Sequence, residues 1–409
     1  MTAAAHPRTP VYLDYQATTP ADPQVVEAML PYFTGVFGNP HSQGHGFGRA
    51  ARDAVEAARA EIAALIGASP REIVFTSGAT EANNLAIKGV AHFHRAEHDH
   101  SVTSVTEHKC VLESCASLAA DGFTVSTLPV QAAGLIDLER LEAAIGPRTV
   151  LVSVMAANNE IGVVAPLAAI GRLCRAHGVL FHTDAAQALG KIPLDVEAMG
   201  IDLMSLSAHK LYGPKGIGAL YVRRRPRVRL EPLLSGGGQE RGLRSGTLAT
   251  PLCVGFGAAC RIAQTEMAAE AERIGALRDH LWRRLSQALP GVRLNGSATA
   301  RLPGNLNISI PAVGDAEALL AALPDVAIST GSACTSAAVE SSYVLRALGI
   351  SEAAASTGVR IGLGRFTTRA EVDYACERII SAVQRLSACA QPAWSNAPEA
   401  IETGPAGSP

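Results

Sequence analysis

Short runs of apolar residues alternate with helical patterns between about residue 70 and residue 225. This alternation is typical of successive strand, helix and strand units, which build a mainly parallel sheet with helices on its faces. The runs are short enough for strands, and turn residues separate them. The pattern predicts seven strands in one large α/β domain, at residues 72–76, 101–105, 123–128, 150–155, 179–183, 202–206 and 218–222.

Helix start and stop signals lie between the expected strands. Asp137 precedes the helical run 138–145 and is a candidate N-cap, because its side chain can accept from free backbone N–H groups. Gly146 and Pro147 follow that run and should end it. An alanine-rich stretch at 52–66 predicts another helix, which ends at Gly67.

The last third of the chain has a different pattern, which predicts a smaller α/β C-terminal domain. A helical stretch at 267–289 leads into short apolar runs such as 306–310 and 326–329. We expect the large domain to span residues 20–265 and the small domain to combine residues 11–19 with 266–394. Residues 1–10 and 395–409 are rich in small residues and proline, so they predict an N-terminal tail and a flexible C-terminal tail.

Composition supports a folded chain with two cores. Its 409 residues are 48% hydrophobic and 18% charged, and the formal net charge is -2. That charge gives no overall field for nucleic acid or an anionic membrane, so we expect direct binding to neither. No apolar run approaches the roughly 18 to 20 residues that span a bilayer, and no signal peptide is evident, which favours a cytoplasmic protein. The eight cysteines include no C-x-x-C pair, so we expect reduced thiols and no bound metal.

Polar residues that follow the expected strands carry the candidate chemistry, because ligands of open α/β sheets bind beyond the carboxyl ends of the strands. Residues 77–81 are small and polar and open a helix, which is equally consistent with a phosphate cradle and with a plain helix cap. A lone Asp or Lys at a strand end is usually a cap or a solvated charge. Here an amine, a carboxylate and a helix N-terminus share one rim, as a pyridoxal cofactor requires. The polar residues at the other tips are Thr106, Glu107, His108, Asn158, Asn159, Glu160, Asp184, Gln187, Ser207, His209 and Lys210.

Over nearly the whole folded chain, from Tyr12 to about Leu386, the sequence resembles the group I cysteine desulfurases. These are fold-type I pyridoxal-phosphate (PLP) enzymes of the class V aminotransferase family, and they serve iron-sulfur cluster assembly and nitrogenase. The resemblance implies a homodimer that removes sulfur from L-cysteine and passes it to an acceptor protein. The most specific matching segments are 37–40, 76–81, 158–162, 207–218, 241–247 and 331–336.

The resemblance also implies roles for individual residues. Lys210 would form the Schiff base with PLP and later move the substrate α proton. Asp184 would pair with the pyridinium nitrogen, His108 would stack on the ring and shuttle protons, and Gln187 would bond the phenolic oxygen. Phosphate would be held by Ala79, Thr80, Ser207 and His209, and by Thr247 from the other subunit. Arg360, Asn159 and, as a further contact, Asn39 would bind the substrate carboxylate, and Asn159 would also lie against the cofactor.

Cys334 is the candidate sulfur carrier. It lies in the stretch 329–336, which is small and polar with almost no apolar anchor, so we expect a mobile loop. A thiolate on such a loop can attack the substrate sulfur and carry a persulfide outward, and the resemblance implies the same role. The other seven cysteines are interpreted as buried or incidental.

Two clusters and two departures from the family pattern leave alternatives open. The histidines at 92, 94, 98 and 100 suggest a solvated helix end more than a metal site, and the arginines between 223 and 229 suggest a solvated edge more than a docking patch for an acidic partner. Ser341 stands where the family usually has proline. The C-terminal tail also lacks the aromatic, apolar ending with which cluster-assembly members engage their scaffold, so the acceptor stays open. The alternatives for function are another PLP lyase or aminotransferase, such as a selenocysteine lyase, and a catalytically dead scaffold.

Overall fold

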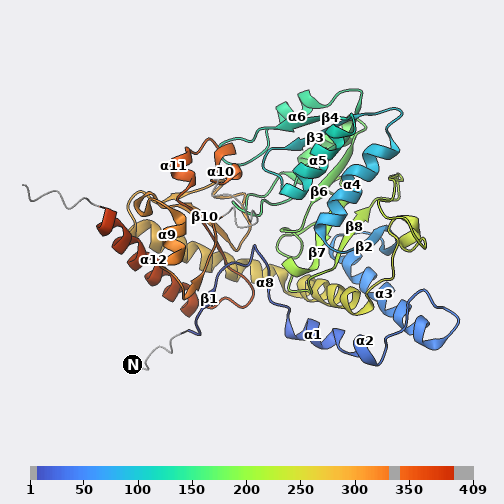
Figure 1. Cartoon of the computed structure of the whole chain (residues 1–409), viewed down its shortest axis with the longest axis horizontal. Coiled ribbons are helices and arrows are strands. Elements are labelled where there is room, and N and C mark those ends of the chain that lie inside the picture. The colour runs from blue at the N-terminus through green and yellow to red at the C-terminus, as the bar shows by residue number, and fades with distance from the viewer. Residues whose placement is uncertain (1–6, 331–340, 391–409) are drawn as a thin grey trace, which may run out of the picture.

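The computed structural model describes residues 7–330 and 341–390, and its large domain is built on a seven-stranded sheet (Figure 1). The strand order is β2-β8-β7-β6-β5-β3-β4. The β8 strand runs antiparallel to both neighbours, and all other neighbouring pairs are parallel. The seven predicted strands are confirmed, with ends that differ by at most two residues. They are β2 (Ile73–Thr76), β3 (His100–Ser104), β4 (Thr124–Leu128), β5 (Thr149–Ser153), β6 (Leu180–Asp184), β7 (Leu203–Ser207) and β8 (Gly218–Val222).

Helices cover both faces of this sheet, which is why its strands read as continuous apolar runs. Successive side chains of a strand point to opposite faces, so Val74 packs with one set of helices and Phe75 with the other. On the Val74 face lie α4 (Ala79–Phe93) and α5 (Lys109–Ala120). The Phe75 face is covered by α3 (Gly46–Leu65), α6 (Leu138–Ala144), α7 (Leu167–Ala176) and the first half of α8 (Thr250–Ala288).

A second core lies beyond the middle of α8. It surrounds a three-stranded antiparallel sheet of order β12-β10-β9 and a two-stranded parallel sheet in which β1 pairs with β11. Figure 1 shows α9 and α12 packed beside these strands. The elements are β1 (Val11–Tyr12), β9 (Arg293–Leu294), β10 (Asn305–Ser309), α9 (Ala316–Ala321), β11 (Val326–Ala327), α10 (Tyr343–Ala347), α11 (Glu352–Ala355), β12 (Gly358–Gly362) and α12 (Arg369–Ala390). Two short helices, α1 (Pro23–Met29) and α2 (Pro31–Thr34), precede α3.

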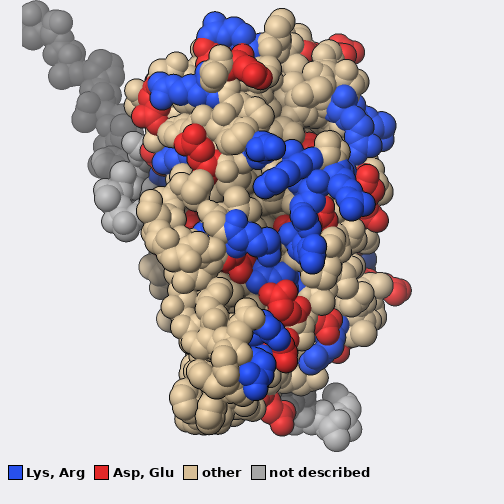
Figure 2. Space-filling model, turned by 90° about the vertical axis from the view of Figure 1, so that its right-hand side faces the viewer, with Lys and Arg blue, Asp and Glu red and all other residues tan. Residues whose placement is uncertain are grey.

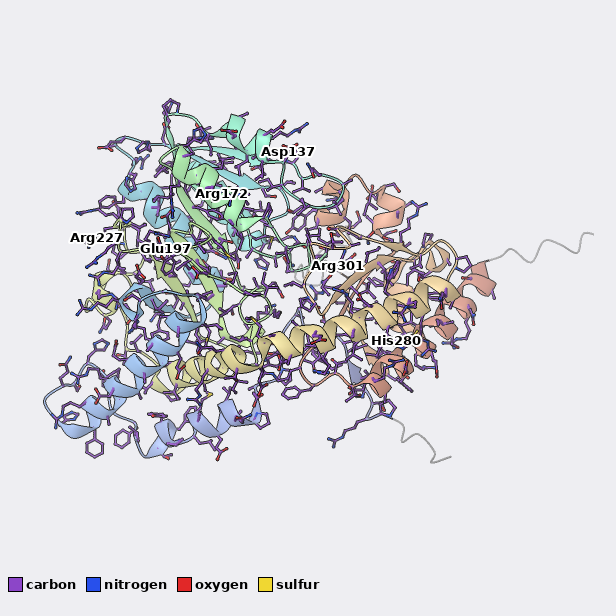
Figure 3. The ribbon with its side chains drawn as sticks, turned by 180° about the vertical axis from the view of Figure 1, so that it is seen from behind. Asp137, Arg172, Glu197, Arg227, His280 and Arg301 are labelled. Carbon is purple, nitrogen blue, oxygen red and sulfur yellow. The ribbon has the colours of Figure 1, made fainter. Side chains whose placement is uncertain are left out.

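The helix α8 connects the two cores. The sequence predicted only its second half, whereas the helix begins at Thr250 and is continuous. Phe256 packs in the large core and Leu281 in the small one. Figure 3 labels His280 in the second half of the helix, and this residue contacts Asp373 of α12 at 2.6 Å. The expected domain boundary at 265 and 266 falls inside this helix, and the division into domains stays a prediction.

Local signals account for the other helix ends. Asp137 accepts from the backbone N–H groups of Glu139 and Arg140, so its predicted role as an N-cap is confirmed. The helix α3 starts six residues before the expected position, because the ring of His45 accepts from Gly48 N and caps an earlier turn. No helix within residues 7–330 and 341–390 is long and apolar enough to cross a membrane. Cys334 and the two terminal tails lie outside the described residues, apart from residues 7–10.

Candidate active site

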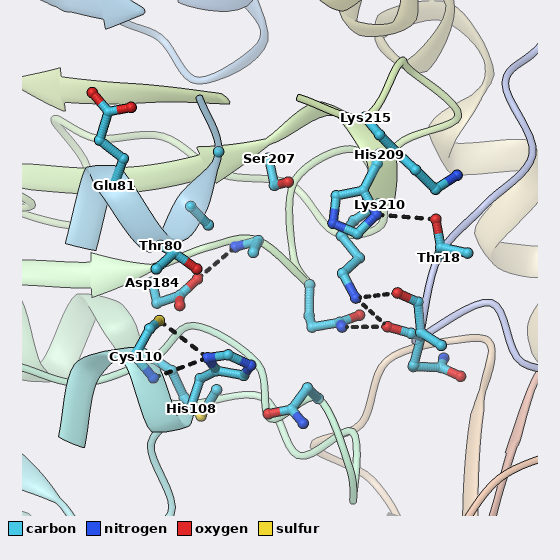
Figure 4. Close-up of a pocket in the computed structure, with 18 of the residues that line it drawn as sticks. Thr18, Thr80, Glu81, His108, Cys110, Asp184, Ser207, His209, Lys210 and Lys215 are labelled. Carbon is cyan, nitrogen blue, oxygen red and sulfur yellow. Dashed lines mark hydrogen bonds between the residues drawn. The ribbon is translucent and has the colours of Figure 1, made fainter. Parts of the chain in front are cut away.

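A cavity of about 570 Å³ opens at the carboxyl ends of the parallel strands. The loops that follow β2, β3, β5, β6 and β7 contribute to its wall, together with Gln16, Ala17 and Thr18 from the N-terminal segment and Arg360 from β12. Figure 4 shows the polar side chains pointing into it from several elements. The cavity brings together ten of the predicted site residues, which are Ala79, Thr80, His108, Asn159, Asp184, Gln187, Ser207, His209, Lys210 and Arg360.

Lys210 follows β7 in a short 3-10 turn that directs its side chain back across the cavity. Its Nζ donates to the backbone oxygens of Gln16 at 2.5 Å and Ala17 at 2.6 Å (Figure 4). Gln187 donates from Nε2 to the same Gln16 oxygen at 2.8 Å. The amine is therefore held at a fixed place by backbone acceptors of the N-terminal segment.

Gln187 also accepts at Oε1 from Nζ of Lys191, at 3.2 Å. The pKa of Lys191 is lowered to about 7, mainly by burial and in part by the charges of Lys210 and Arg360. The amide of Gln187 thus has its oxygen directed to an ammonium group and its nitrogen directed to a carbonyl. This pairing fixes which end of the amide faces each neighbour.

Asp184 ends β6, and it is only 5% exposed. Its Oδ1 accepts from Ala186 N at 2.9 Å, and its Oδ2 accepts from Asn83 Nδ2 at 2.7 Å. Two N–H donors therefore fix the plane of this carboxylate, which is a suitable partner for a protonated ring nitrogen.

His108 is the N-cap of α5, and its ring contacts the first turn of that helix. The ring Nδ1 accepts from the backbone N–H of Cys110 at 3.2 Å and lies 3.0 Å from Sγ of the same residue (Figure 4). The preceding residue, Glu107, is fully buried and accepts at Oε1 from Met155 N at 2.7 Å. Burial raises the pKa of Glu107 well above its ordinary value, against the effect of that hydrogen bond.

The start of α4 lines the cavity and has the features of an anion cradle. Its N-cap is Gly78, which has no side chain to cap the first-turn N–H groups, and Ala79 and Thr80 of that turn line the cavity. A Cβ on Gly218 of β8 would lie 2.7 Å from the backbone of Gly78. Glycine at 218 therefore allows β8 to pack against the backbone at the start of α4, which lines the cavity.

His209 and Lys215 also line the cavity. Nδ1 of His209 is 3.0 Å from Oγ1 of Thr18 (Figure 4). The pKa of His209 is lowered to about 4, mainly by burial and in part by the charges of Lys210, Lys215 and Lys191. His209 is therefore neutral at physiological pH, and the positive charge here comes from lysine.

Arg360 is almost completely buried in the part of the cavity wall that β12 contributes. It donates from one terminal nitrogen to Asn159 O at 2.9 Å and from the other to Asp14 Oδ1 at 2.8 Å. Its Nε and the Oδ1 of Asn159 are buried and have no protein partner within the described residues. This wall therefore keeps a cationic donor available for a carboxylate.

Three predicted site residues do not line the cavity of the described chain. Thr247 and Asn39 are exposed, and Asn39 accepts from His41 N at 2.9 Å. Cys334 lies outside the described residues. The roles that the resemblance implies for these three residues stay predictions.

Several residues of the cavity were not predicted from sequence. The Gln16 and Ala17 oxygens are backbone acceptors, which no residue pattern reveals. Cys110 was interpreted as incidental, although it lines the cavity. Glu81 accepts from Ser77 N at 2.7 Å and Arg244 Nε at 2.8 Å, and these bonds lower its pKa against the opposing effect of burial. The signal for Glu81 in the sequence was its position four residues after Ser77, in the first turn of the expected helix, where its carboxylate can reach back to the backbone N–H of Ser77.

The two clusters left open by the sequence lie away from this cavity. Among the histidines, His92 stacks on Phe123 and His100 lies between Thr149 and Ser126. In the arginine run, Arg223 is buried and pairs with Glu197 and Asp202. The loop after β8 that holds the other arginines lies at the outer edge of the large domain, where Figure 3 labels Arg227. Figure 2 shows basic side chains gathered on one face, with acidic side chains interspersed.

Known proteins are similar to this chain in sequence and fold. The family model described as aminotransferase class-V matches residues 11–375. A cysteine desulfurase of Homo sapiens is 58% identical over 393 residues, which cover 96% of this chain and 86% of the relative. A NifS-like protein of known structure superimposes with a TM-score of 0.85 at 37% identity, covering 92% of this chain and 99% of that one. The structure titled SspA in complex with cysteine gives a TM-score of 0.77 at 40% identity, covering 87% and 99%. The chain therefore belongs to the aminotransferase class-V family.

Proposed function

We propose that this protein is a PLP-dependent cysteine desulfurase, which takes sulfur from L-cysteine and leaves L-alanine and a persulfide on Cys334. One observation carries the proposal: Lys210, Asp184, His108 and Arg360 converge on a single cavity at the carboxyl ends of the sheet. The similarity to cysteine desulfurases over 96% of the chain supports the same activity.

The donor set of the cavity fits PLP. The start of α4 offers backbone N–H groups to phosphate, and Ser207, His209 and Lys215 line the same cavity. Asp184 offers a fixed carboxylate to the ring nitrogen, and Lys210 offers the amine. When bound, PLP supplies an electron sink for charge that develops at the substrate α carbon.

The chain's own residues would bind the substrate and move its protons. Arg360 orients the substrate carboxylate through its available Nε, with Asn159 beside it. Lys210 takes the α proton on Nζ, and the backbone oxygens of Gln16 and Ala17 orient that nitrogen. The thiolate of Cys334 then attacks the substrate sulfur, and the bond from sulfur to the β carbon breaks. The substrate carbon skeleton takes up protons and leaves as alanine.

We also propose a homodimer in which Thr247 of each subunit completes the other subunit's phosphate site. Support comes from its exposure in the single chain, away from the chain's own cavity. An apolar surface around α1, α2 and the start of α3 offers a contact face. Its large side chains are Leu30, Phe33, Phe37 and Phe47, which are 58%, 56%, 64% and 57% exposed.

The persulfide would pass to a sulfur acceptor, in iron-sulfur cluster assembly or in thio-modification of tRNA or DNA, which makes the enzyme a sulfurtransferase. Its cytoplasmic location stays a prediction from sequence. Replacing Cys334 with Ser tests the function. The variant should release no sulfur from L-cysteine while keeping the visible absorbance of bound PLP, and a Cys389→Ser variant serves as control for the loss of a thiol. Full turnover of L-cysteine by Cys334→Ser would refute the role of Cys334 and favour a lyase that needs no protein thiol, such as a selenocysteine lyase.

A further inference from the structure

Asp184 and His108 are connected by two residues that the proposed chemistry does not use. Asn83 lies near the start of α4 with no exposed surface, and Cys110 lies in the first turn of α5 and lines the cavity. The Nδ2 group of Asn83 donates to Asp184 Oδ2 at 2.7 Å and to Cys110 Sγ at 3.1 Å. Both hydrogens of the amide are thus used, one on each neighbour.

The direction of these hydrogen bonds is fixed by what each group can do. A flipped Asn83 amide would place its oxygen against the carboxylate of Asp184, which can only accept when ionised. Asn83 therefore donates to sulfur, and the Cys110 thiol has its own hydrogen left to donate. The acceptor beside it is Nδ1 of His108, 3.0 Å from Sγ.

A second donor reaches the same ring nitrogen. The backbone N–H of Cys110 points at Nδ1 of His108 at 3.2 Å. A proton on Nδ1 would face this N–H group, so Nδ1 keeps its lone pair and the proton of the neutral ring is on Nε2. An ion pair between a Cys110 thiolate and a His108 imidazolium would also need a proton on Nδ1, so the backbone N–H of Cys110 disfavours that pair as well.

We propose that Asn83 and Cys110 are positioning residues, which form a hydrogen-bond bridge from Asp184 to His108 and hold the imidazole as its Nε2–H tautomer. The importance of that tautomer for PLP chemistry rests on the proposed function, since an Nε2–H group can donate a proton whereas a bare Nε2 can only accept one. The bridge itself is a property of the protein and can be measured with or without cofactor.

The experiment uses the full-length protein labelled with 15N in histidine, both loaded with PLP and after its removal. Long-range proton–nitrogen correlation spectra show which ring nitrogen carries hydrogen, and the loss of one signal set in His108→Gln identifies His108. We compare wild type with Cys110→Ala and Cys110→Ser. Cys115→Ala is the matched control, because it removes a thiol of the same helix that has no bond to the imidazole.

Wild type should show His108 with hydrogen on Nε2 and none on Nδ1. Loss of the thiol removes one of two donors to Nδ1, so the Nδ1–H fraction in Cys110→Ala should rise by about two- to tenfold. Its His108 pKa should rise by about half a unit to one unit, because the lost bond favours the neutral ring. Other charged groups near this ring, Glu107, Asp184 and Lys210, are unchanged in these variants. Cys110→Ser should lie closer to wild type, because a hydroxyl also accepts and donates.

A proton on Nδ1 in wild type would overturn the proposal. So would a Cys110→Ala spectrum with the tautomer and pKa of wild type, or the same change in Cys115→Ala. A protein that shows the bridge but releases no sulfur would contradict the proposed function alone. Sulfur release by a protein with Nδ1 protonated would contradict the bridge alone.

Discussion

Replacing Asp184 with Asn should separate cofactor binding from folding. The substitution keeps the size of the side chain and removes its charge, so the ring nitrogen of PLP loses an ionised acceptor. A hydrogen bond to a charged group contributes about 1.5 to 3 kcal/mol, which corresponds to about 10- to 150-fold weaker binding of PLP. Because the carboxylate is 5% exposed, solvent cannot replace it.

In the protein without cofactor, Asp184→Asn should lower the free energy of unfolding by less than it weakens PLP binding, and this loss has a separate origin. Wild-type Asp184 accepts from Ala186 N and from Asn83 Nδ2. An amide at position 184 has only one acceptor oxygen, so one of these donors loses its partner unless Asn83 turns its unpaired Oδ1 toward the new amide. One unsatisfied buried donor costs about 1 to 3 kcal/mol, and the turn of Asn83 reduces that cost.

The assay is a titration of cofactor-free protein with PLP, followed by absorbance, together with urea unfolding of the same samples. Asp202→Asn is the matched control, because Asp202 also accepts a strand N–H, from Phe181 at 2.9 Å, but does not line the cavity. It should lose stability and keep its affinity for PLP. The reasoning would be refuted by Asp184→Asn binding PLP as tightly as wild type, or by an equal loss of affinity in Asp202→Asn.

Three further substitutions test other parts of the structure. Arg360→Lys should raise KM for L-cysteine by about 10- to 100-fold without changing the absorbance of bound PLP, because an ammonium group cannot reproduce the planar set of donors with which Arg360 holds Asn159 O and Asp14 while its Nε meets a carboxylate; an unchanged KM would contradict that role. Glu240→Gln breaks a buried ion pair in which Arg59 donates through two nitrogens, both at 2.8 Å. The free energy of unfolding in urea should fall by about 3 to 5 kcal/mol, and a fall below about 1 kcal/mol would contradict the stabilising role of this pair. Burial raises the pKa of Glu160 from 4.5 to about 7, so the folded protein keeps a proton that the unfolded chain releases between these values. The contribution of Glu160 to the free energy of unfolding is fully present below pH 4.5, and it falls by about 3 kcal/mol as pH rises to 7. Urea titrations of Glu160→Gln at pH 5 and pH 8 should lack this fall.

The sheet was predictable because its strands are buried on both faces and therefore read as apolar runs between turn signals. The first half of α8 was missed for a related reason. Around Phe256 this helix is buried on nearly all sides, with glycine and alanine at its close contacts, so no polar stripe with helical spacing marks it. Its second half is exposed along one side, and the sequence shows the helical pattern there.

The cavity was predictable where side chains at strand ends carry its chemistry, as with Asp184 and Lys210. It was not predictable where the partner is a backbone oxygen, such as that of Gln16, or where a residue has an unremarkable type. Cys110 is such a residue, because only the fold places its sulfur between Asn83 and His108. Contacts across a subunit interface, as proposed for Thr247, need a second chain.

The covalent attachment of PLP to Lys210 can be tested most directly by borohydride reduction of the purified protein, followed by peptide mass spectrometry. We expect a coloured protein that loses its visible absorbance on reduction and gains the mass of reduced cofactor on the peptide that contains Lys210. The Lys210→Ala variant should gain no such mass. A colourless protein that takes up no PLP when supplied with it, or a mass gain on another lysine such as Lys191, would contradict the account.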